Sequence, residues 1–295
     1  KQKYVMLGVT GPNEYENNVN NNWYTSRIAR WTLEYTLASL EHVRTDDPGA
    51  YERILAGAGL DLESETAAWK DIIHNIYLPY HEEKHVFLQQ EGYMDKEQIM
   101  ASELDPSERP INQHWSWDRI LRSCFIKQAD VLQGIYLFED QCDTETIRRN
   151  FDFYEPRTVH ESSLSPCVHS ILAARISRIE KAYELYLRTS RLDLDDYNHE
   201  VDEGLHITSM GGTWMSVVYG FGGMRILEGM LSFVPQLPPN WKILSFKILF
   251  RDRTLKVLIE KSRVTIENLD GENLEILLSG TRRHLEKGGA VVGIL

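Results

Sequence analysis

The most chemically distinctive stretch of the chain is GVTGPNEYENNVNNNWYT, residues 8 to 25. Gly11 and Pro12 favour a turn, and the dense asparagines favour an irregular, hydrogen-bonded loop over a helix. Glu14 is therefore expected on a loop before a helix, among amide groups suited to sugar hydroxyls. A carboxyl kept protonated there by partial desolvation could donate to a departing glycosidic oxygen. From the residues alone we favour a polar capping loop with a solvated glutamate.

A second polar pair stands in an apolar stretch. IKQADVLQG, residues 126 to 134, sets Lys127 beside Gln128 in what the pattern predicts to be an apolar helix. The simplest interpretation is a lysine that reaches solvent past a surface glutamine. HESSLS, residues 160 to 165, brings a histidine and three serines to an expected helix start. Those hydroxyls are interpreted first as caps, with the lining of an active-site mouth as the alternative.

GLHITSMGGTW, residues 204 to 214, combines a histidine, hydroxyls and a glycine pair ahead of an expected helix. Free backbone N–H groups and the helix dipole favour an anion at such a position. Glycine also lets a phosphate oxygen approach the backbone closely. Paired glycines before helices are common, so this pattern alone is weak.

One stretch satisfies a metalloprotease pattern. Residues 81 to 85, HEEKH, match HExxH, which binds zinc when both histidines share one face of a helix in a buried cleft. Pro79 directly precedes the region, the neighbours are charged, and a third ligand at a suitable spacing is missing from the sequence. We therefore predict a solvated loop or short helix here, and no metal site. The cysteine spacing also supports none.

The elements that would position these residues are mainly helical up to about residue 232. Apolar residues recur every three or four positions, and capping residues and prolines mark the helix ends. The first helix has apolar residues on more than one face, which predicts packing between two layers. Helices are expected over residues 22 to 43, 64 to 76, 116 to 137 and 165 to 187, and from Gly212 to about residue 233.

The pattern changes at Pro235, where a cluster of prolines interrupts the chain. Beyond it, apolar residues alternate with a period of two over residues 255 to 259 and 264 to 266, and Asp270 with Gly271 marks a turn. We therefore predict a mainly α fold, a helical toroid followed by a small antiparallel β-sandwich domain.

The length, charge and cysteine content of the chain exclude several classes of function. The chain has 295 residues, enough to bury a large core, and its 44 acidic and 32 basic residues give a net charge of −12. Such a charge repels nucleic acid and anionic membranes, so neither is expected as a partner. Apolar runs of the length that spans a membrane are missing. Three cysteines cannot close a disulfide framework, which fits a cytoplasmic protein.

GVTGPNEY followed by NNVNNNWYT resembles the proton-donor loop of glycoside hydrolase family 65, and the resemblance covers the whole chain. It implies an (α/α)6 barrel, with residues 1–233 forming its C-terminal portion and residues 234–295 a β domain. The general acid of the family corresponds to Glu14. Asn13 and Trp23 are typical of the members that act on maltose.

The resemblance also assigns roles to the other motifs. Lys127 and Gln128 correspond to a pair that contacts the sugar in the donor subsite. The loop before the last helix corresponds to a phosphate-binding loop, which assigns phosphate contacts to His206, Ser209, Gly211 and Gly212. The preceding part of the family's fold is absent from this sequence, so we expect an N-terminal portion to complete the site. Family members also suggest a homodimer.

The implied reaction is inverting phosphorolysis of maltose to β-D-glucose 1-phosphate and D-glucose. An inverting glycosidase needs an acid and a base, whereas phosphate is already an anionic nucleophile, so the acid suffices. Maltose and inorganic phosphate would be the substrates, with no cofactor or metal. The alternatives are a sister phosphorylase for trehalose, kojibiose or nigerose, a phosphate-independent hydrolase, or a non-catalytic carbohydrate-binding module.

Overall fold

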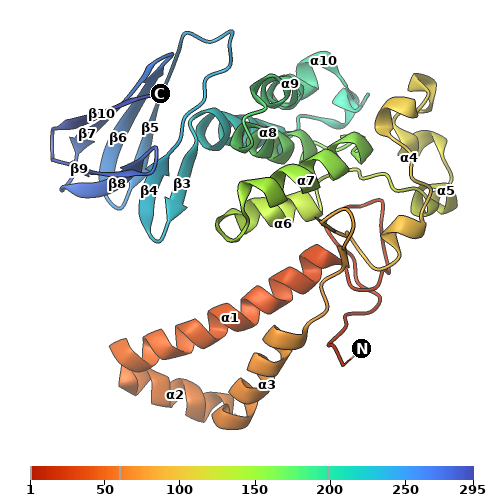
Figure 1. The fold of residues 1–295 in the computed structure, drawn as a ribbon, viewed down its shortest axis with the longest axis horizontal. Helices are drawn as coiled ribbons and strands as arrows, with labels where there is room; N and C mark the ends of the chain where they lie inside the picture. The colour runs from red at the N-terminus through yellow and green to blue at the C-terminus, as the bar shows by residue number, and fades with distance from the viewer. Residues whose placement is uncertain (1, 60, 198) are drawn as a thin grey trace.

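The computed structural model describes residues 2–59, 61–197 and 199–295. Lys1, where the sequence begins, lies outside the described residues. Figure 1 shows a helical body, a β region at one end of it, and an arm of helices that extends below the body. Among the described residues, none of the helices is both long enough and apolar enough to cross a lipid bilayer.

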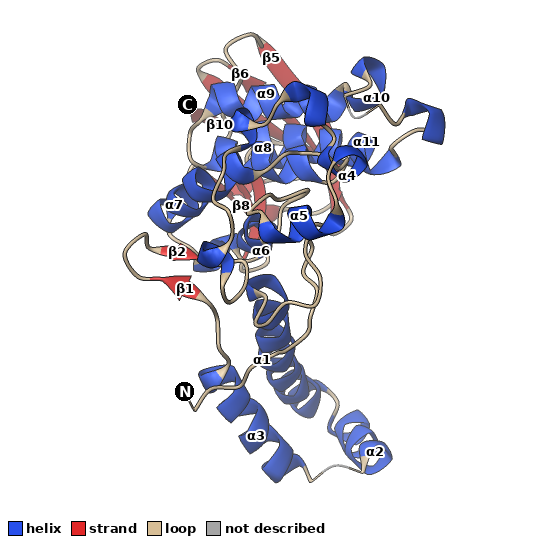
Figure 2. Cartoon of the chain, turned by 90° about the vertical axis from the view of Figure 1, so that its right-hand side faces the viewer, coloured by secondary structure: helices blue, strands red, loops and turns tan. Residues whose placement is uncertain are grey.

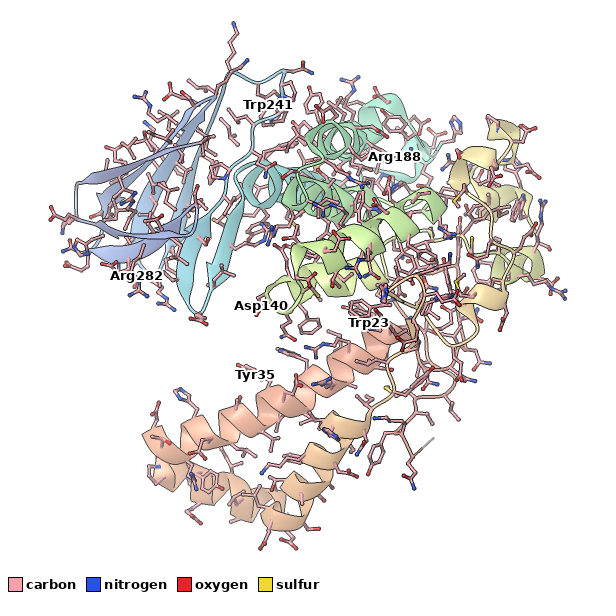
Figure 3. All side chains as sticks on the ribbon, viewed as in Figure 1. Trp23, Tyr35, Asp140, Arg188, Trp241 and Arg282 are labelled. Atoms are coloured by element: carbon pink, nitrogen blue, oxygen red, sulfur yellow. The ribbon has the colours of Figure 1, made fainter. Side chains whose placement is uncertain are left out.

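The arm consists of α1 (Trp23–Asp46), α2 (Pro48–Ala58) and α3 (Leu62–Asn75). The side chain of Asn22 caps α1 by accepting from the Thr25 N–H at 2.8 Å. Only the first turn of α1 is buried, and Tyr35, halfway along, is 61% exposed. Figures 2 and 3 show how the helix leaves the body after Trp23. The prediction that this helix packs between two layers is therefore wrong.

The body is built around one buried helix. This helix, α8 (Ser165–Arg175), has Pro166 in its first turn and is buried over residues 165 to 174. Its neighbours are α6 (Val131–Leu137), α7 (Thr144–Tyr154), α9 (Ile179–Ser190) and α11 (Ile207–Met215), with the short α10 (Leu192–Asp195) after α9. The segment between the arm and α6 carries the hairpin β1 (Tyr80–His81) and β2 (Val86–Phe87), followed by the short helices α4 (Ile111–His114) and α5 (Trp117–Arg122).

The single helix expected over residues 116 to 137 is two helices. Residues 123 to 130 separate α5 from α6 as a non-helical segment with isolated bridges at Ser123 and Ile126, so Lys127 and Gln128 do not lie in a helix. The cause is a set of long-range hydrogen bonds. Ile126 exchanges backbone bonds with Arg157 and Val159, and the Lys127 N–H donates to the side chain of Asn13 at 2.9 Å. These partners hold the backbone away from a helical path.

The last helix also ends earlier than expected. A six-residue π-helical stretch (Ser216–Phe221) follows α11, and β3 (Met224–Leu227) and β4 (Met230–Phe233) then replace the predicted helix. Gly223 has φ +60°, and a Cβ there would lie 2.0 Å from the Val234 carbonyl oxygen. Only glycine fits this turn. The division of the chain into domains at residue 233 stays a prediction.

The β region contains two four-stranded sheets. One has the order β10 (Ala290–Ile294), β7 (Arg263–Asp270), β6 (Arg253–Glu260), β5 (Ile243–Phe250) and is antiparallel. The other has the order β3, β4, β8 (Leu274–Leu278), β9 (Thr281–Leu285), and its β4–β8 pair is parallel. The predicted alternation is confirmed, since Leu255, Val257, Ile259, Val264 and Ile266 are all fully buried. Trp241 makes edge contacts with rings of α9 at the junction with the body (Figure 3).

Candidate active site

The loop that carries Glu14 is anchored by Asn13, which is completely buried. The Asn13 amide donates to Gln89 and to the Phe125 carbonyl, both at 3.3 Å. Its side-chain oxygen accepts from the N–H groups of Tyr15 and Lys127. The Asn13 side chain therefore holds the backbone next to Glu14 and joins this loop to the non-helical segment of Lys127.

The buried carboxyl group of Asp130 also holds this loop in place. Asp130 accepts from the Asn13 N–H at 3.2 Å and from the Asn22 amide at 3.1 Å. Burial raises the pKa of Asp130 to about 7, although these two donors oppose the shift. Gly11 is required beside it, because a Cβ there would lie 2.3 Å from both the Asp130 carboxylate and the Asn22 amide.

Tyr15 and Glu16 hold the other side of the loop. The Tyr15 hydroxyl donates to Glu161 at 2.7 Å, and burial together with the Glu161 charge raises the pKa of Tyr15. Glu16 forms a buried ion pair with Lys96, but desolvation still raises the pKa of Glu16. With its neighbours fixed in this way, the position of the Glu14 backbone is determined on both sides.

The Glu14 side chain is exposed to solvent. It is 57% exposed, and its carboxylate lies 2.5 Å from the ammonium group of Lys127. More than half of the side chain is thus open to solvent, as the residues alone predicted, and the partial desolvation that would favour a proton donor is not supplied by this chain. Lys127 is 22% exposed and also lies 5.9 Å from the centre of the Tyr15 ring. The structure thus brings Glu14 and Lys127 into direct contact.

Glu14 lies at the edge of a cavity of about 540 Å³. The side chains that line it belong to the loop of Glu14, to the segment of Gln128 and to the helices α1, α6, α8 and α11. Gln128 is 95% buried, and its side-chain oxygen has no hydrogen-bond partner among the residues that the structure describes. A buried acceptor at a cavity wall is ready to accept from a ligand hydroxyl. The lining residues are Pro12, Glu14, Tyr24, Gln128, Ala129, Gln133, Leu164, Cys167, Val168, Thr208, Gly211, Gly212 and Met215.

The glycine pair lies inside α11 and not ahead of it, because the helix begins at Ile207. The two glycines have different surroundings. A Cβ on Gly211 would meet nothing within 4 Å, whereas one on Gly212 would lie 2.8 Å from the Cβ of Cys167. Gly212 thus permits close contact between α11 and α8. The helix start is nearer to Thr208, which also lines the cavity.

His206 and Ser209 stand apart from this cavity. His206 caps the start of α11 in sequence, and its ring lies 2.6 Å from Asp193 and 3.6 Å from Glu200. The hydrogen bonds from His206 lower the pKa of Asp193. Ser209 is buried and donates to the Thr189 carbonyl oxygen at 2.6 Å. Neither side chain lines the cavity that contains Glu14.

The HESSLS stretch, residues 160 to 165, contacts the start of α11 at the cavity. Ser163 lies 2.8 Å from the hydroxyl of Thr208, and so ties this loop to the start of α11. Ser162 accepts locally from the Leu164 N–H, and Ser165 contacts His160. The interpretation of these serines as caps is therefore wrong, because α8 has Leu164 at its N-cap position and no side-chain cap, while Ser163 supports the cavity wall. Thr208 itself was not expected from the sequence, although it lies in the 204 to 214 stretch.

The HEEKH stretch forms the turn of the β1–β2 hairpin, where a loop or short helix was expected. Within the described ranges, its histidines take part in no cluster with metal-ligand spacing. A different group, Glu155 with His160 and His169, has such spacing. Its carboxylate is already engaged by both rings and by Lys181 at 3.0 Å. We therefore interpret it as a buried hydrogen-bonded cluster.

The architecture is part of an (α/α)6 barrel followed by a β domain, with a carboxyl group and a buried amide facing one cavity. The chain belongs to glycosyl hydrolase family 65. Residues 1–215 match the central catalytic domain of that family, and residues 224–285 match its C-terminal domain. The resemblance seen in the sequence and the predicted fold class are thereby confirmed.

Several relatives show the range of the family. The chain is 55% identical to maltose phosphorylase of Bacillus subtilis (strain 168), over 94% of the chain. It is 39% identical to α,α-trehalose phosphorylase of Thermoanaerobacter brockii, over 97% of the chain. A solved structure provisionally named a kojibiose phosphorylase, from the human microbiome, superposes on the whole chain with a TM-score of 0.90 at 35% identity. The chain spans 35%, 37% and 40% of the lengths of these three proteins.

Proposed function

We propose that this protein carries out inverting phosphorolysis of maltose, giving β-D-glucose 1-phosphate and D-glucose. The observation that carries the proposal is the shared cavity. Glu14, Gln128 and the first turns of α11 line it together, and Lys127 contacts Glu14. An acid, a sugar-binding amide and a helix start suited to an anion then face one space.

Glu14 is proposed as the proton donor to the departing glucose. Its exposed carboxyl group can reach a glycosidic oxygen bound in the cavity, and a bound sugar would supply the desolvation that the described chain lacks. Gln128 would accept from a hydroxyl of the donor glucose through its unpaired oxygen. Lys127, whose ammonium group lies 2.5 Å from the Glu14 carboxylate, would bind the sugar and would also partly neutralise the negative charge of incoming phosphate.

Phosphate would bind at the start of α11. Thr208 lines the cavity there, Gly211 and Gly212 line it further along the helix, and we retain His206 and Ser209 as proposed ligands on family resemblance. Those two side chains would have to exchange partners, because His206 contacts Asp193 and Ser209 donates to Thr189. Phosphate is an anionic nucleophile, so the proposal needs no catalytic base, organic cofactor or metal.

The substrate is proposed from the relatives. Identity is 55% to the maltose phosphorylase of B. subtilis, against 39% to a trehalose phosphorylase and 34% to a kojibiose phosphorylase of Halothermothrix orenii. A sister phosphorylase with another disaccharide is the second candidate. Because the chain spans 35% of the B. subtilis enzyme, we propose that an N-terminal portion completes the donor site. A homodimer in the cytoplasm is proposed on the same resemblance.

The proposal is tested by glucose release from maltose by the intact protein, with and without phosphate. Release should require phosphate, and Glu14→Gln should lower kcat by about 10²- to 10⁴-fold with the fold unchanged. Glu82→Gln, in the exposed HEEKH turn, is the matched control and should leave the rate unchanged.

Three outcomes would count against this assignment. Near-normal turnover by Glu14→Gln rejects Glu14 as the acid. Glucose release without phosphate indicates a hydrolase, and sugar binding without turnover indicates a non-catalytic module. Faster phosphorolysis of trehalose, kojibiose or nigerose than of maltose would replace the substrate but keep the reaction class.

A further inference from the structure

A second, more polar cavity of about 170 Å³ lies on the side of the body that faces α4. It is bounded by the short 3-10 helix Pro106–Glu108, the start of α4, the C-terminal part of α9 and the segment after α10. It shares no lining residue with the cavity of Glu14. Its lining residues are Pro106, Arg109, Pro110, Glu161, Arg188, Tyr197 and His199.

Arg109 is fixed at one wall of this cavity. Its Nη2 donates to the Val159 carbonyl oxygen, and its Nε donates to Glu161 at 3.3 Å. Its Nη1 has no hydrogen-bond partner in the part of the chain that the structure describes. One end of the guanidinium group is thus anchored to backbone and carboxylate, which leaves the other end available to a ligand.

Arg188 approaches from the last turn of α9 (Figure 3). Its Nη2 donates to the His160 carbonyl oxygen at 3.0 Å, and its guanidinium lies 5.3 Å from the centre of the Tyr197 ring. Its Nε is buried, and within residues 2–59, 61–197 and 199–295 neither Nε nor Nη1 has a hydrogen-bond partner. Arg188 is therefore oriented by the protein without having its donors satisfied.

The cavity carries more positive than negative charge. Burial lowers the pKa of Arg188, and the nearby charge of Arg109 lowers it further. Glu161 is the carboxylate in the lining, and its oxygens already accept from Tyr15, Ile111 and Arg109. One shared carboxylate faces two guanidinium groups, so the lining has a local excess of positive charge that an anion would balance.

We propose that this cavity binds a tetrahedral oxyanion, either inorganic phosphate or the phosphate group of a sugar phosphate, between Arg109 and Arg188. A planar guanidinium presents parallel N–H groups that match the oxygens of phosphate. Water occupies about 30 Å³ per molecule in the liquid, so the volume admits a phosphate with a few waters or a small substituent. The site is separate from the one in which Glu14 is proposed to act.

This proposal does not depend on the proposed reaction, because none of its residues is assigned to the phosphorolysis site. It predicts a class of phosphate binding in the intact protein that requires Arg188, and phosphate bound at the Glu14 cavity would form a separate class that does not require Arg188. Isothermal titration calorimetry with inorganic phosphate, and separately with glucose 1-phosphate, measures both. Arg188→Gln should weaken one class by about tenfold or more and leave the other unchanged.

Arg149→Gln is the matched control, because Arg149 is a half-exposed arginine of α7 that pairs with Glu145 and does not line the cavity. It should bind phosphate like the unaltered protein. Whichever of the two ligands shows the tighter Arg188-dependent binding identifies the source of the phosphate group. Both results support the site, since both require the same guanidinium groups.

Unchanged binding isotherms in both Arg188→Gln and Arg109→Gln would overturn the proposal. If Arg188→Gln does not fold, Arg188→Lys keeps the charge beside the His160 carbonyl but loses the paired N–H geometry. That variant should still bind phosphate more weakly than the unaltered protein. Equal affinity in Arg188→Lys and in the unaltered protein would reject a guanidinium-based site.

Discussion

At the scale of single residues, Asn13 matters as much as the glutamate that follows it. Its side chain donates to Gln89 and Phe125 and accepts from the N–H groups of Tyr15 and Lys127. Asn13→Ala would leave four buried groups without their partner, at about 1–3 kcal/mol for a buried unsatisfied group. We expect a lower free energy of unfolding and a fall in kcat larger than any rise in the KM for maltose.

Asn17→Ala is the control for this prediction, since Asn17 is exposed in the same loop and should tolerate the change. Urea unfolding and initial rates over a range of maltose concentrations measure the two effects. A variant Asn13→Ala with normal kcat would show that the Glu14 loop keeps its position without this side chain.

Of the site residues predicted from the sequence, Glu14, Gln128, Gly211 and Gly212 line one cavity, but the contacts that surround them were not predicted. The acid loop indicated Glu14, and Lys127 lies 2.5 Å from it although 113 residues separate the two. The burial of Asn13 and the support from Asp130 were not predicted, because both depend on contacts across more than 100 residues. Thr208 was missed because a threonine in a short polar stretch carries no pattern of its own.

At the scale of elements, the contact between α11 and α8 depends on one glycine. A Cβ on Gly212 would lie 2.8 Å from the Cβ and 3.1 Å from the Sγ of Cys167. Gly212→Ala should therefore force the two helices apart and lower the free energy of unfolding by about 1–3 kcal/mol, as overpacked cores do. Chemical denaturation of the intact protein measures this loss.

The neighbouring Gly211 provides the matched control. A Cβ there meets nothing within 4 Å, and alanine is favoured over glycine in a helix by up to about 1 kcal/mol. Gly211→Ala should leave stability unchanged or raise it. Equal destabilisation by both substitutions would show that the cost arises from the helix backbone and not from the contact with Cys167.

Helical periodicity predicted which segments are helical, but not where long-range contacts interrupt them. The helix expected over residues 116 to 137 breaks because the Lys127 N–H is held by Asn13, 114 residues away in the sequence. The last helix ends because Gly223 adopts a positive φ next to Val234. Strand alternation was a safer guide over residues 255 to 266, since one face of each strand is fully buried there.

At the scale of the whole molecule, two buried groups give stability opposite dependences on pH. Burial raises the pKa of Asp130 from 3.8 to about 7, so the folded chain holds a proton that the unfolded chain releases above 3.8. That contribution to stability falls as pH rises from about 4 to 7. Burial lowers the pKa of His160 from 6.5 to about 4, so there the unfolded chain takes up the extra proton. That contribution falls as pH drops from 6.5 to 4.

Between pH 5 and 6 both groups change the free energy of unfolding. Each contributes about 1.4 kcal/mol per pH unit, and the two contributions have opposite sign. Asp130→Asn removes the first, so the free energy of unfolding of this variant should rise with pH more steeply than that of the unaltered protein. His160→Gln removes the second, and its free energy of unfolding should fall with pH relative to the unaltered protein. Urea unfolding at several pH values measures the three slopes.

The double variant is the decisive comparison, because it should restore the slope of the unaltered protein. Asp130 supports the loop of Glu14 and His160 lies in the Glu155 cluster, and the hydrogen bonds of these two described side chains do not join them to each other. Their contributions should therefore add. Parallel slopes in the unaltered protein and in Asp130→Asn would show that Asp130 does not hold its proton in the folded chain, and that its two amide donors suffice to keep a buried carboxylate charged.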